Sequence, residues 1–497
     1  MASLVEDLKM LVRTRHPLVS IRTMEEEHAA RMIRETGREM GLAVLEWSIS
    51  DGLRGSIPAS GGPVTGTDTL LGALKFMWNN TNVNLYVLKD AMRFLKEPAV
   101  ERMLREVAAD YGRDSRTVFM IDPAGELPDL LRALAVPFEV ALPTDGEIRK
   151  IVKETYRKVT AFGEAKVSMT RAEFGLFING LRGLTRREVS QLVVDAVLGD
   201  GVLSAKDIAK AAEVKRRRLK QTGVLDYIPP PEVAPRIGGM ESLRSWLGRR
   251  SKAFTPKARA YGLEPPRGML MLGVQGCGKS LMARYVAAQW KMPLLRMDVG
   301  ALYDKYVGET ERHLRQAFSM ASAMAPCVLW IDEVEKAFAS SMAGVASDAG
   351  LSLRMLGQLL TWMQEHTDAV FLVATANDVS ALPPELLRKG RFDEVFFVDL
   401  PGAAARKEIL RIHLGKRKRD PKGFDLDRMV EASDGFSGAE IEQAIVSALY
   451  AAFNADRELT TDDVLSELSA TRPLSVLMAE KVAALRAWAE GRCVRAD

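Results

Sequence analysis

Apolar and polar positions alternate along the first third of the chain in a pattern that predicts strands and helices in turn. Short runs rich in Val, Ile and Leu are separated by longer segments in which apolar residues recur every three or four positions. This alternation predicts a parallel sheet with helices on both faces. The expected strands are 17–23, 42–49, 83–90 and 117–122, and the expected helices are 24–40, 67–78 and 99–111.

A second series of the same kind follows later in the chain. An apolar run at 269–273 precedes a glycine-rich turn and a helical segment at 279–290. Residues 126–156 and 381–414 also share a Leu-Pro pair, an LLR triplet, a Phe, a Glu-Val pair and a closing Leu-Pro before a helix. Because such internal repeats mark repeated modules, we expect an α/β fold with two tandem modules, each a three-layer core around a parallel sheet plus a helical lid.

Proline and cap residues indicate where the domains divide. Three consecutive prolines in DYIPPPEVAP favour a stiff, extended linker. Helix caps are expected at Thr170, Thr185 and Ser204 in the segment before it. The expected domains are 1–165, an α/β module; 166–225, its helical lid; 226–235, the linker; 236–400, a second α/β core; and 401–497, its helical lid.

Composition narrows the class of protein. Of the 497 residues, 47% are hydrophobic and 27% are charged, and no uninterrupted apolar run is long enough for a bilayer span. The first residues carry no signal-peptide pattern, so a cytoplasmic protein is expected. The three cysteines lack disulfide or zinc spacing, and a net charge of +4 does not by itself imply nucleic acid as a partner.

The stretch GVQGCGKS matches the phosphate-binding pattern G-x-x-x-x-G-K-[ST] in its required strand–turn–helix setting. Glycines let the backbone turn its N–H groups inward on a triphosphate, and the helix that follows presents the positive end of its dipole. Lys279 is expected to reach the β- and γ-phosphates, and Ser280 to ligate Mg²⁺. The expected ATP-binding residues are Gly273, Val274, Gln275, Gly276, Cys277, Gly278, Lys279, Ser280 and Leu281.

Two further apolar runs end in residues suited to phosphate hydrolysis. Asp332 is expected to hold Mg²⁺ and Glu333 to polarise the attacking water, while Asn377 would orient that water. Arg388 and Arg391 follow at a spacing of three. They are expected to act as arginine fingers on a neighbouring subunit's nucleotide, and the alternative for them is an ordinary surface charge pair.

In this order, GVQGCGKS, LWIDEVEKAF, ATAND, LLRKGRFDE and DGFSGAEIEQAIVSA resemble the AAA clade of AAA+ ATPases, over about residues 235–470. The resemblance implies a hexameric ring with ATP and Mg²⁺ bound between subunits and arginine fingers acting in trans. It also implies that Ile237 and Gly238 lie near the adenine, and that Gly438 and Ala439 start the lid helix that touches the nucleotide.

The segment LYDKYVGETERHLRQAF occupies the place of the central pore loop in such rings. By this resemblance Lys305, Tyr306 and Val307 would grip an extended peptide, because an aromatic ring on a loop can hold a chain without reading its sequence. The alternative interpretation of the segment is a helix cap with a buried tyrosine.

The first module lacks these motifs. Directly after 17–23 the chain has Met24, Glu25, Glu26 and Glu27 and no glycine, and the three carboxylates would repel a triphosphate. Lys89 and Asp90 stand where the acid pair would be. With the opening segment LVRTRHPLVSIRTMEEEHAARMI, a module without nucleotide motifs before an intact one resembles an AAA ATPase family encoded in algal plastids and cyanobacteria and found in other bacteria.

The function predicted from the sequence is Mg²⁺-dependent ATP hydrolysis by a hexameric ring that remodels protein substrates or complexes. One alternative is an ATP-dependent scaffold or switch that threads nothing. Another is a nucleic-acid-stimulated motor that uses the basic runs at 215–220 and 415–420. Nucleic acid is not the favoured partner, because neither basic run has interleaved aromatic residues on which bases could stack. A protein substrate or adaptor is expected, but its identity is not written in the sequence.

Overall fold

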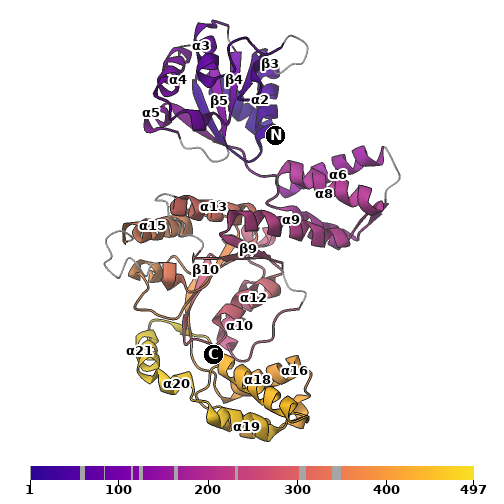
Figure 1. The fold of residues 1–497 in the computed structure, drawn as a ribbon, viewed down its shortest axis with the longest axis vertical. Coiled ribbons are helices and arrows are strands. Elements are labelled where there is room, and N and C mark those ends of the chain that lie inside the picture. Colours follow the sequence, from indigo (N-terminus) through magenta and orange to yellow (C-terminus); the bar gives the residue numbers. More distant parts are fainter. Residues whose placement is uncertain are drawn as a thin grey trace. The chain divides into compact units, whose positions relative to one another are not determined.

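The structure is a computed structural model that forms two compact units, Met1–Asp207 and Ile208–Asp497 (Figure 1). It describes residues 2–55, 62–82, 84–113, 116–122, 127–161, 166–229, 233–300, 309–337, 349–388 and 390–497. The expected pore-loop residues Lys305, Tyr306 and Val307 lie outside these ranges. Within the described ranges, no helix combines the length and apolar character needed to cross a membrane.

The first unit is built on a six-stranded sheet of order β3-β2-β4-β5-β1-β6. All neighbours pair in parallel except β3, which runs antiparallel to β2. Helices α1 and α2 pack on one face, and α3 and α4 on the other (Figure 1). The elements are α1 (Ala2–Arg13), β1 (Leu18–Arg22), α2 (Glu26–Met40), β2 (Ala43–Ser48), β3 (Gly52–Gly55), α3 (Leu70–Asn79), β4 (Asn84–Lys89), η1 (Ala91–Phe94), α4 (Pro98–Tyr111), β5 (Thr117–Asp122), α5 (Asp129–Arg132) and β6 (Ala135–Glu139).

Helices and a two-stranded sheet follow, and the last of these helices, α9, begins in the first unit and continues into the second. Thr170 and Thr185 cap their helices through capping boxes, as the sequence predicts. Ser204 instead ends a strand, and its backbone N–H donates to the side chain of Asp207 (2.8 Å). The elements are α6 (Asp145–Thr160), β7 (Lys166–Ser168), α7 (Arg171–Leu181), α8 (Arg186–Asp200), β8 (Val202–Ser204) and α9 (Lys206–Thr222).

The second unit contains a seven-stranded sheet of order β15-β14-β10-β13-β12-β11-β9. Along β10, side chains alternate between two cores. One core is shared with α13 and α15 and the other with α10 and α12, and these two pairs of helices lie on opposite sides of the sheet (Figure 1). The elements are β9 (Leu225–Ile228), α10 (Glu241–Arg250), α11 (Pro256–Ala260), β10 (Gly268–Gly273), α12 (Lys279–Trp290), β11 (Leu294–Met297), α13 (Glu309–Ala323), β12 (Cys327–Ile331), η3 (Val334–Ala337), α15 (Ala349–Glu365), β13 (Val370–Ala376), η4 (Pro384–Leu387) and β14 (Glu394–Val398).

A helical lid with its own core completes this unit. After the lid, the chain returns to the sheet, where β15 pairs with β14. The elements are α16 (Ala403–Lys416), η5 (Pro421–Gly423), α17 (Leu426–Ala432), α18 (Gly438–Asn454), α19 (Thr461–Ala470), α20 (Leu474–Leu477), α21 (Ala479–Ala489) and β15 (Val494–Arg495).

The two sheets share one topology. Their five central strands run in parallel in the orders β6-β1-β5-β4-β2 and β14-β10-β13-β12-β11. Numbered by chain order within each module, both read 5-1-4-3-2. The predicted fold class, two tandem α/β modules, is confirmed.

The structure differs from the expected domain limits around residue 225. The expected lid of the first module, 166–225, divides between the two units, because the apolar side chains of Leu219, Val224 and Leu225 are buried in the core of the second unit. The first residues of the expected linker, 226–235, belong to β9, which pairs antiparallel with β11. An edge strand this short is set by pairing with its neighbour, which the local sequence does not show.

Candidate active site

The glycine-rich turn follows a strand whose six residues are all buried. A Cβ on Gly273 would lie 1.9 Å from the carbonyl oxygen of Val398 in the neighbouring strand, so no other residue fits there. Gly276 and Gly278 have φ values of +77° and +87°, in the left-handed region that favours glycine. The turn therefore has the backbone form that the phosphate-binding pattern requires, and α12 begins directly after it.

Lys279 is buried at the start of α12, with 5% of its surface exposed. Its Nζ donates hydrogen bonds to the carbonyl oxygens of Gly273 and Val274, both at 2.8 Å. Burial lowers the pKa of Lys279 to about 8. The ammonium group is thus held inside the turn, where a phosphate would stabilise its charge. Burial also raises the pKa of the neighbouring Cys277 to about 12, which makes that thiol a packing residue and not a reactive group.

Ser280, in the first turn of α12, meets Asp332, which directly follows the carboxyl end of β12. Ser280 Oγ donates to Asp332 Oδ1 at 3.0 Å, and Thr375 Oγ1 donates to the same oxygen at 2.5 Å. Strands β10, β13 and β12 are neighbours in the sheet, which brings the three side chains to one edge. A hydroxyl and a carboxylate are oxygen ligands of the kind that Mg²⁺ takes, one or two from protein with the rest from water and phosphate. The pair fits the predicted metal site.

Glu333 and Asn377 also lie together. Asn377 Nδ2 donates to Glu333 Oε1 at 3.0 Å, and Lys336 Nζ lies 2.5 Å from Glu333 Oε2. Glu333 has a left-handed backbone (φ +49°), and its N–H donates to Thr375 Oγ1 at 3.0 Å. A carboxylate and an amide side by side can together hold and polarise a water molecule.

Two residues that support this cluster were not predicted from the sequence. Thr375 bonds both members of the acid pair, as described above. Glu335, which is 7% exposed, accepts the backbone N–H of Asn377 at 2.9 Å, and burial raises its pKa. The sequence carries a signal for each of them. Thr375 is a polar residue within the otherwise apolar strand β13, and Glu335 is an acid two positions after Glu333.

Replacing Thr375 by valine should lower the rate of the chemical step about tenfold, because at nearly constant volume it removes the acceptor of the Glu333 N–H and one of the two hydroxyls that donate to Asp332 Oδ1. Thr375→Ser keeps the hydroxyl and should retain most of the rate. Single-turnover kinetics on both variants test this. Equal rates for the valine and serine variants would show that the hydroxyl does not position the acid pair.

The lid closes over the turn on one side. The N–H of Ala439 donates to the carbonyl oxygen of Gly276 at 3.1 Å, and a Cβ on Gly276 would lie 2.9 Å from Ser437 Oγ. Gly438 is the first residue of α18, and Leu281 lies in α12, half-buried. A Cβ on Gly238 would lie 2.8 Å from the carbonyl oxygen of Ala405 in α16. These sequence-predicted residues thus lie around the turn, and Gln275 is exposed on it.

The two arginines lie on another segment of the chain, next to η4. Arg388 and Arg391 follow η4, and Arg391 Nη1 donates to the carbonyl oxygen of Glu385. Among the residues that the structure describes, neither arginine forms an ion pair with Asp332 or Glu333. Arg388 is exposed and Arg391 is half-buried.

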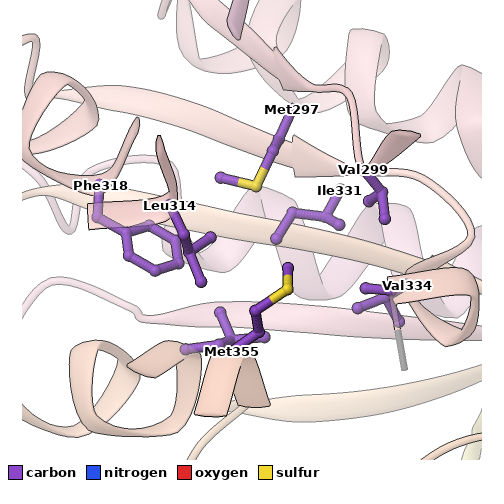
Figure 2. Close-up of a pocket in the computed structure, with 9 residues that line it drawn as sticks. Met297, Val299, Leu314, Phe318, Ile331, Val334 and Met355 are labelled. Carbon is purple, nitrogen blue, oxygen red and sulfur yellow. The ribbon is translucent and has the colours of Figure 1, made fainter. Parts of the chain in front are cut away.

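A small cavity nearby is not a second candidate site. Figure 2 shows Met297, Ile331 and Met355 pointing into it from β11, β12 and α15. Its volume is about 20 Å³ and its lining is apolar, so it has room for about one water molecule and no polar group to hold one. It is a gap in the core beside the strand that leads to Asp332.

The corresponding place in the first unit has the opposite charge pattern. Glu26 starts the helix after β1, as Lys279 does after β10, and Lys89 ends β4 next to a left-handed Asp90 (φ +50°). Lys89 Nζ lies 3.5 Å from Glu26 and 3.1 Å from Glu46. The first unit therefore has an acid, Glu26, where the second has Lys279, and a base, Lys89, where the second has Asp332. It lacks the nucleotide motifs, as the sequence predicts.

Glu25 then connects this place to the helices of the same unit. It is 5% exposed, and its carboxylate accepts the backbone N–H of Arg186 at 2.7 Å and lies 3.4 Å from that guanidinium. Arg186 starts α8 and also pairs with Glu147 at 3.0 Å. In the second unit, the lid meets the glycine-rich turn where the N–H of Ala439 donates to Gly276. At the corresponding place in the first unit, the ion pair of Glu25 and Arg186 joins α8 to the segment after β1.

Comparisons with known proteins agree with these observations. A model of the ATPase family associated with various cellular activities (AAA) matches residues 269–400, and a model of the AAA+ lid domain matches 423–467. Models of the N-terminal and second domains of SpoVK-like AAA ATPases match residues 4–140 and 146–222.

Some relatives match almost the whole chain, and others match less than half of it. The protein "Uncharacterized AAA domain-containing protein ycf46" of Trieres chinensis is 34% identical over 492 residues, covering 99% of this chain and 97% of the relative. Its namesake in Pyropia yezoensis is 34% identical over 499 residues, covering 99% of both. "Proteasome-activating nucleotidase" of Aeropyrum pernix is 36% identical over 212 residues, covering 42% of this chain and 51% of the relative. The chain therefore belongs to the AAA ATPase family and is an ATPase.

Proposed function

We propose that the chain assembles into a hexameric ring that hydrolyses ATP with Mg²⁺ and uses the hydrolysis to remodel protein substrates or complexes. One observation carries the proposal. The predicted site residues converge at one edge of the sheet, although they lie far apart in the sequence. They are Lys279 and Ser280 in α12, Asp332 and Glu333 after β12, and Asn377 after β13.

Each residue has a role that its contacts support. The N–H groups of 273–278 and Lys279 bind the phosphates, and Ser280 and Asp332 hold the ion. When bound, Mg²⁺ neutralises charge on the phosphate oxygens. Glu333 and Asn377 hold the attacking water, and Glu333 polarises it. Ile237 and Gly238 contact the adenine, while Gly438 and Ala439 bring the lid to the nucleotide.

Arg388 and Arg391 complete a site on the neighbouring subunit in this proposal. They belong to no ion pair with the acids of their own site among the described residues, and Arg391 is tethered through Glu385 near a helical turn. A guanidinium brought to a phosphate from outside stabilises the charge that develops in the transition state. Hydrolysis then depends on assembly of the ring.

ATP binding should take up a proton near pH 8.5 because Lys279, with a pKa of about 8 in the free protein, is mostly neutral there and becomes charged beside the phosphates. At about pH 6.5 Lys279 is already protonated and contributes no uptake. Isothermal titration calorimetry in buffers of different protonation enthalpy measures the uptake at each pH. An apparent binding enthalpy that is independent of the buffer at both pH values would contradict the assignment.

The remodelling role rests on Lys305, Tyr306 and Val307, which we propose to grip substrate, and on the relatives named for proteasome activation. The first unit, Met1–Asp207, would serve as a platform without nucleotide chemistry, and the second unit, Ile208–Asp497, would serve as the motor. The internal ion pair of Glu25 and Arg186 supports a static role for the first module. The cytoplasmic location stays a prediction.

Capture of ATP-locked complexes tests the role. Glu333→Gln and the double variant Glu333→Gln/Tyr306→Ala are used to pull partners from native lysate. Remodelling would be supported by proteins that are captured only when Tyr306 is present. These proteins should also crosslink to residue 305 or 307, as expected for a chain that passes through the pore. The same partners bound equally by both variants would contradict threading and favour a switch whose partners bind the first module. Stimulation of ATPase activity by DNA or RNA that weakens steeply with salt would instead favour the nucleic-acid motor.

A further inference from the structure

The last described residues return from the lid to the nucleotide-binding core. β15 pairs with the edge of β14, with Val494 opposite Phe396 and Arg495 opposite Phe397. The N–H of Ala496 then donates to the carbonyl oxygen of Phe397 at 3.0 Å. Ala496 is 2% exposed and shares a core cluster with Val274 and Cys277 of the glycine-rich turn. This end of the chain is therefore packed against the ATP site.

Asp497 and Ala496 supply hydrogen-bond acceptors that helix α10 does not supply for itself. The residue before α10, Met240, has a left-handed backbone (φ +58°) and no side-chain cap. Its N–H donates to Asp497 Oδ1, and Ser242 Oγ donates to the main-chain oxygen of Asp497 at 3.0 Å. The N–H of Leu243 donates to the carbonyl oxygen of Ala496 at 3.0 Å. N–H groups in the first turn of a helix need partners of this kind.

The segment held in this way, 237–240, lies between three surfaces. On the lid side, a Cβ on Gly238 would approach Ile409 Cγ1 of α16 to 2.9 Å. On the tail side, a Cβ on Gly239 would approach Asp497 Oδ1 to 2.8 Å. On the side of the glycine-rich turn, Met240 Cε would lie 3.3 Å from a Cβ on Gly278. The segment thus borders the lid, Asp497 and the glycine-rich turn, and the hydrogen bond from Met240 to Asp497 is one of the contacts that fix its position.

We propose that Asp497 is a positioning residue for the base-binding side of the ATP site. It fixes residues 237–240 through Met240, so that Ile237 and Gly238 are already placed when the adenine arrives. This inference rests on the proposed function, in which those two residues contact the base. Asp497 touches no reacting atom, and its effect on ATP passes through the segment it holds.

The physical consequence is a selective loss of affinity. Asp497→Ala removes the acceptor of the Met240 N–H, and the segment must then be ordered by the nucleotide itself, at a cost to binding. Affinity for ATP should fall about tenfold, whereas affinity for inorganic tripolyphosphate, which has no base, should change by less than about twofold. Asp497 is exposed, so its truncation opens no cavity in the core.

The test is a set of fluorescence titrations on the full chain, with a labelled ATP analogue and with displacement by ATP or by tripolyphosphate. Asp497→Asn keeps an acceptor oxygen at the same position and should restore ATP affinity to within about twofold of the original chain. Arg495→Ala, an exposed neighbour on β15, is the matched control and should bind both ligands normally. Hydrogen exchange of residues 237–243 without nucleotide should be faster in Asp497→Ala alone.

The outcomes separate this inference from the proposed function. Lys279→Ala should abolish binding of ATP and of tripolyphosphate. If it does, and Asp497→Ala binds ATP like the original chain, the inference is wrong and the ATP site stands. A parallel loss of ATP and tripolyphosphate in Asp497→Ala would also overturn it, because a general loosening of the fold would then account for the effect. If Lys279→Ala binds both ligands normally, the ATP site itself is misplaced.

Discussion

Glu333→Gln will bind ATP but turn it over about 10²- to 10⁴-fold more slowly than the original chain. Glutamine keeps the shape of the side chain and an oxygen for the hydrogen bond from Asn377 Nδ2 (3.0 Å). It removes the negative charge that polarises water, while the phosphate contacts of Lys279 are unaffected. Single-turnover hydrolysis gives the rate, and a binding titration gives the affinity.

The matched control is Glu458→Gln, which removes the same charge from an exposed ion pair with Arg419 in the lid. It should hydrolyse ATP at the original rate, since exposed ion pairs contribute little. Equal rates for Glu333→Gln and Glu458→Gln would mean that another group activates the water. Loss of ATP binding in Glu333→Gln would mean that this carboxylate belongs to the binding surface and not to the chemistry.

Arg391→Ala will lower the hydrolysis rate about 10³- to 10⁵-fold in the assembled protein, the range measured when an arginine finger is removed. The affinity for ATP should change much less, because the charge that Arg391 stabilises develops only in the transition state. Hydrolysis rate and nucleotide affinity are measured at a protein concentration at which the ring is assembled.

Arg428→Ala is the control for this change. Arg428 pairs with Asp462 at 3.3 Å on the exposed lid, so its loss should leave the hydrolysis rate unchanged. If Arg391→Ala hydrolysed ATP normally, including as a dilute monomer, the arginine would have no part in the chemistry and the assignment in trans would fail.

Much of the fold and of the ATP site is visible in the sequence because it depends on local pattern. Strands such as Leu18–Arg22 and Gly268–Gly273 are apolar runs followed by a helical period, and the turn at 273–278 needs glycines wherever it occurs. The convergence of Asp332 and Asn377 then follows from parallel strands ending at one edge of a sheet. These features need no knowledge of distant contacts.

The features that the sequence does not show are those fixed by partners far along the chain. β9 and β15 are short edge strands whose register is set by β11 and β14. Asp497 bonds the backbone of Met240, and a hydrogen bond to a backbone group leaves no residue type to recognise at that position. The same holds for Glu25, whose repulsion of phosphate is predictable but whose pairing with Arg186 is not.

The two units share one topology but differ in the charged residues at corresponding places. The five parallel strands have the same order in both units, but β10 is followed by a glycine-rich turn, whereas β1 is followed by Glu25 and Glu26. In the first, Glu26 pairs with Lys89, and Glu25 pairs with Arg186, at places where the second presents Lys279 and the lid to a nucleotide. These ion pairs do not depend on a bound nucleotide, so we expect the first unit to keep one conformation while the second changes with nucleotide state.

The central claim, an ATP site completed by the neighbouring subunit, is tested most directly by mixing two inactive variants. Glu333→Gln keeps Arg391, and Arg391→Ala keeps Glu333. In rings assembled from equal amounts of both, about a quarter of the interfaces would join an intact Glu333 to an intact Arg391. We predict that ATP hydrolysis, which is at least about 10²-fold slower in each variant alone, increases on mixing and rises with assembly. If the mixture stays inactive although mass measurement shows mixed rings, Arg391 does not act across the interface.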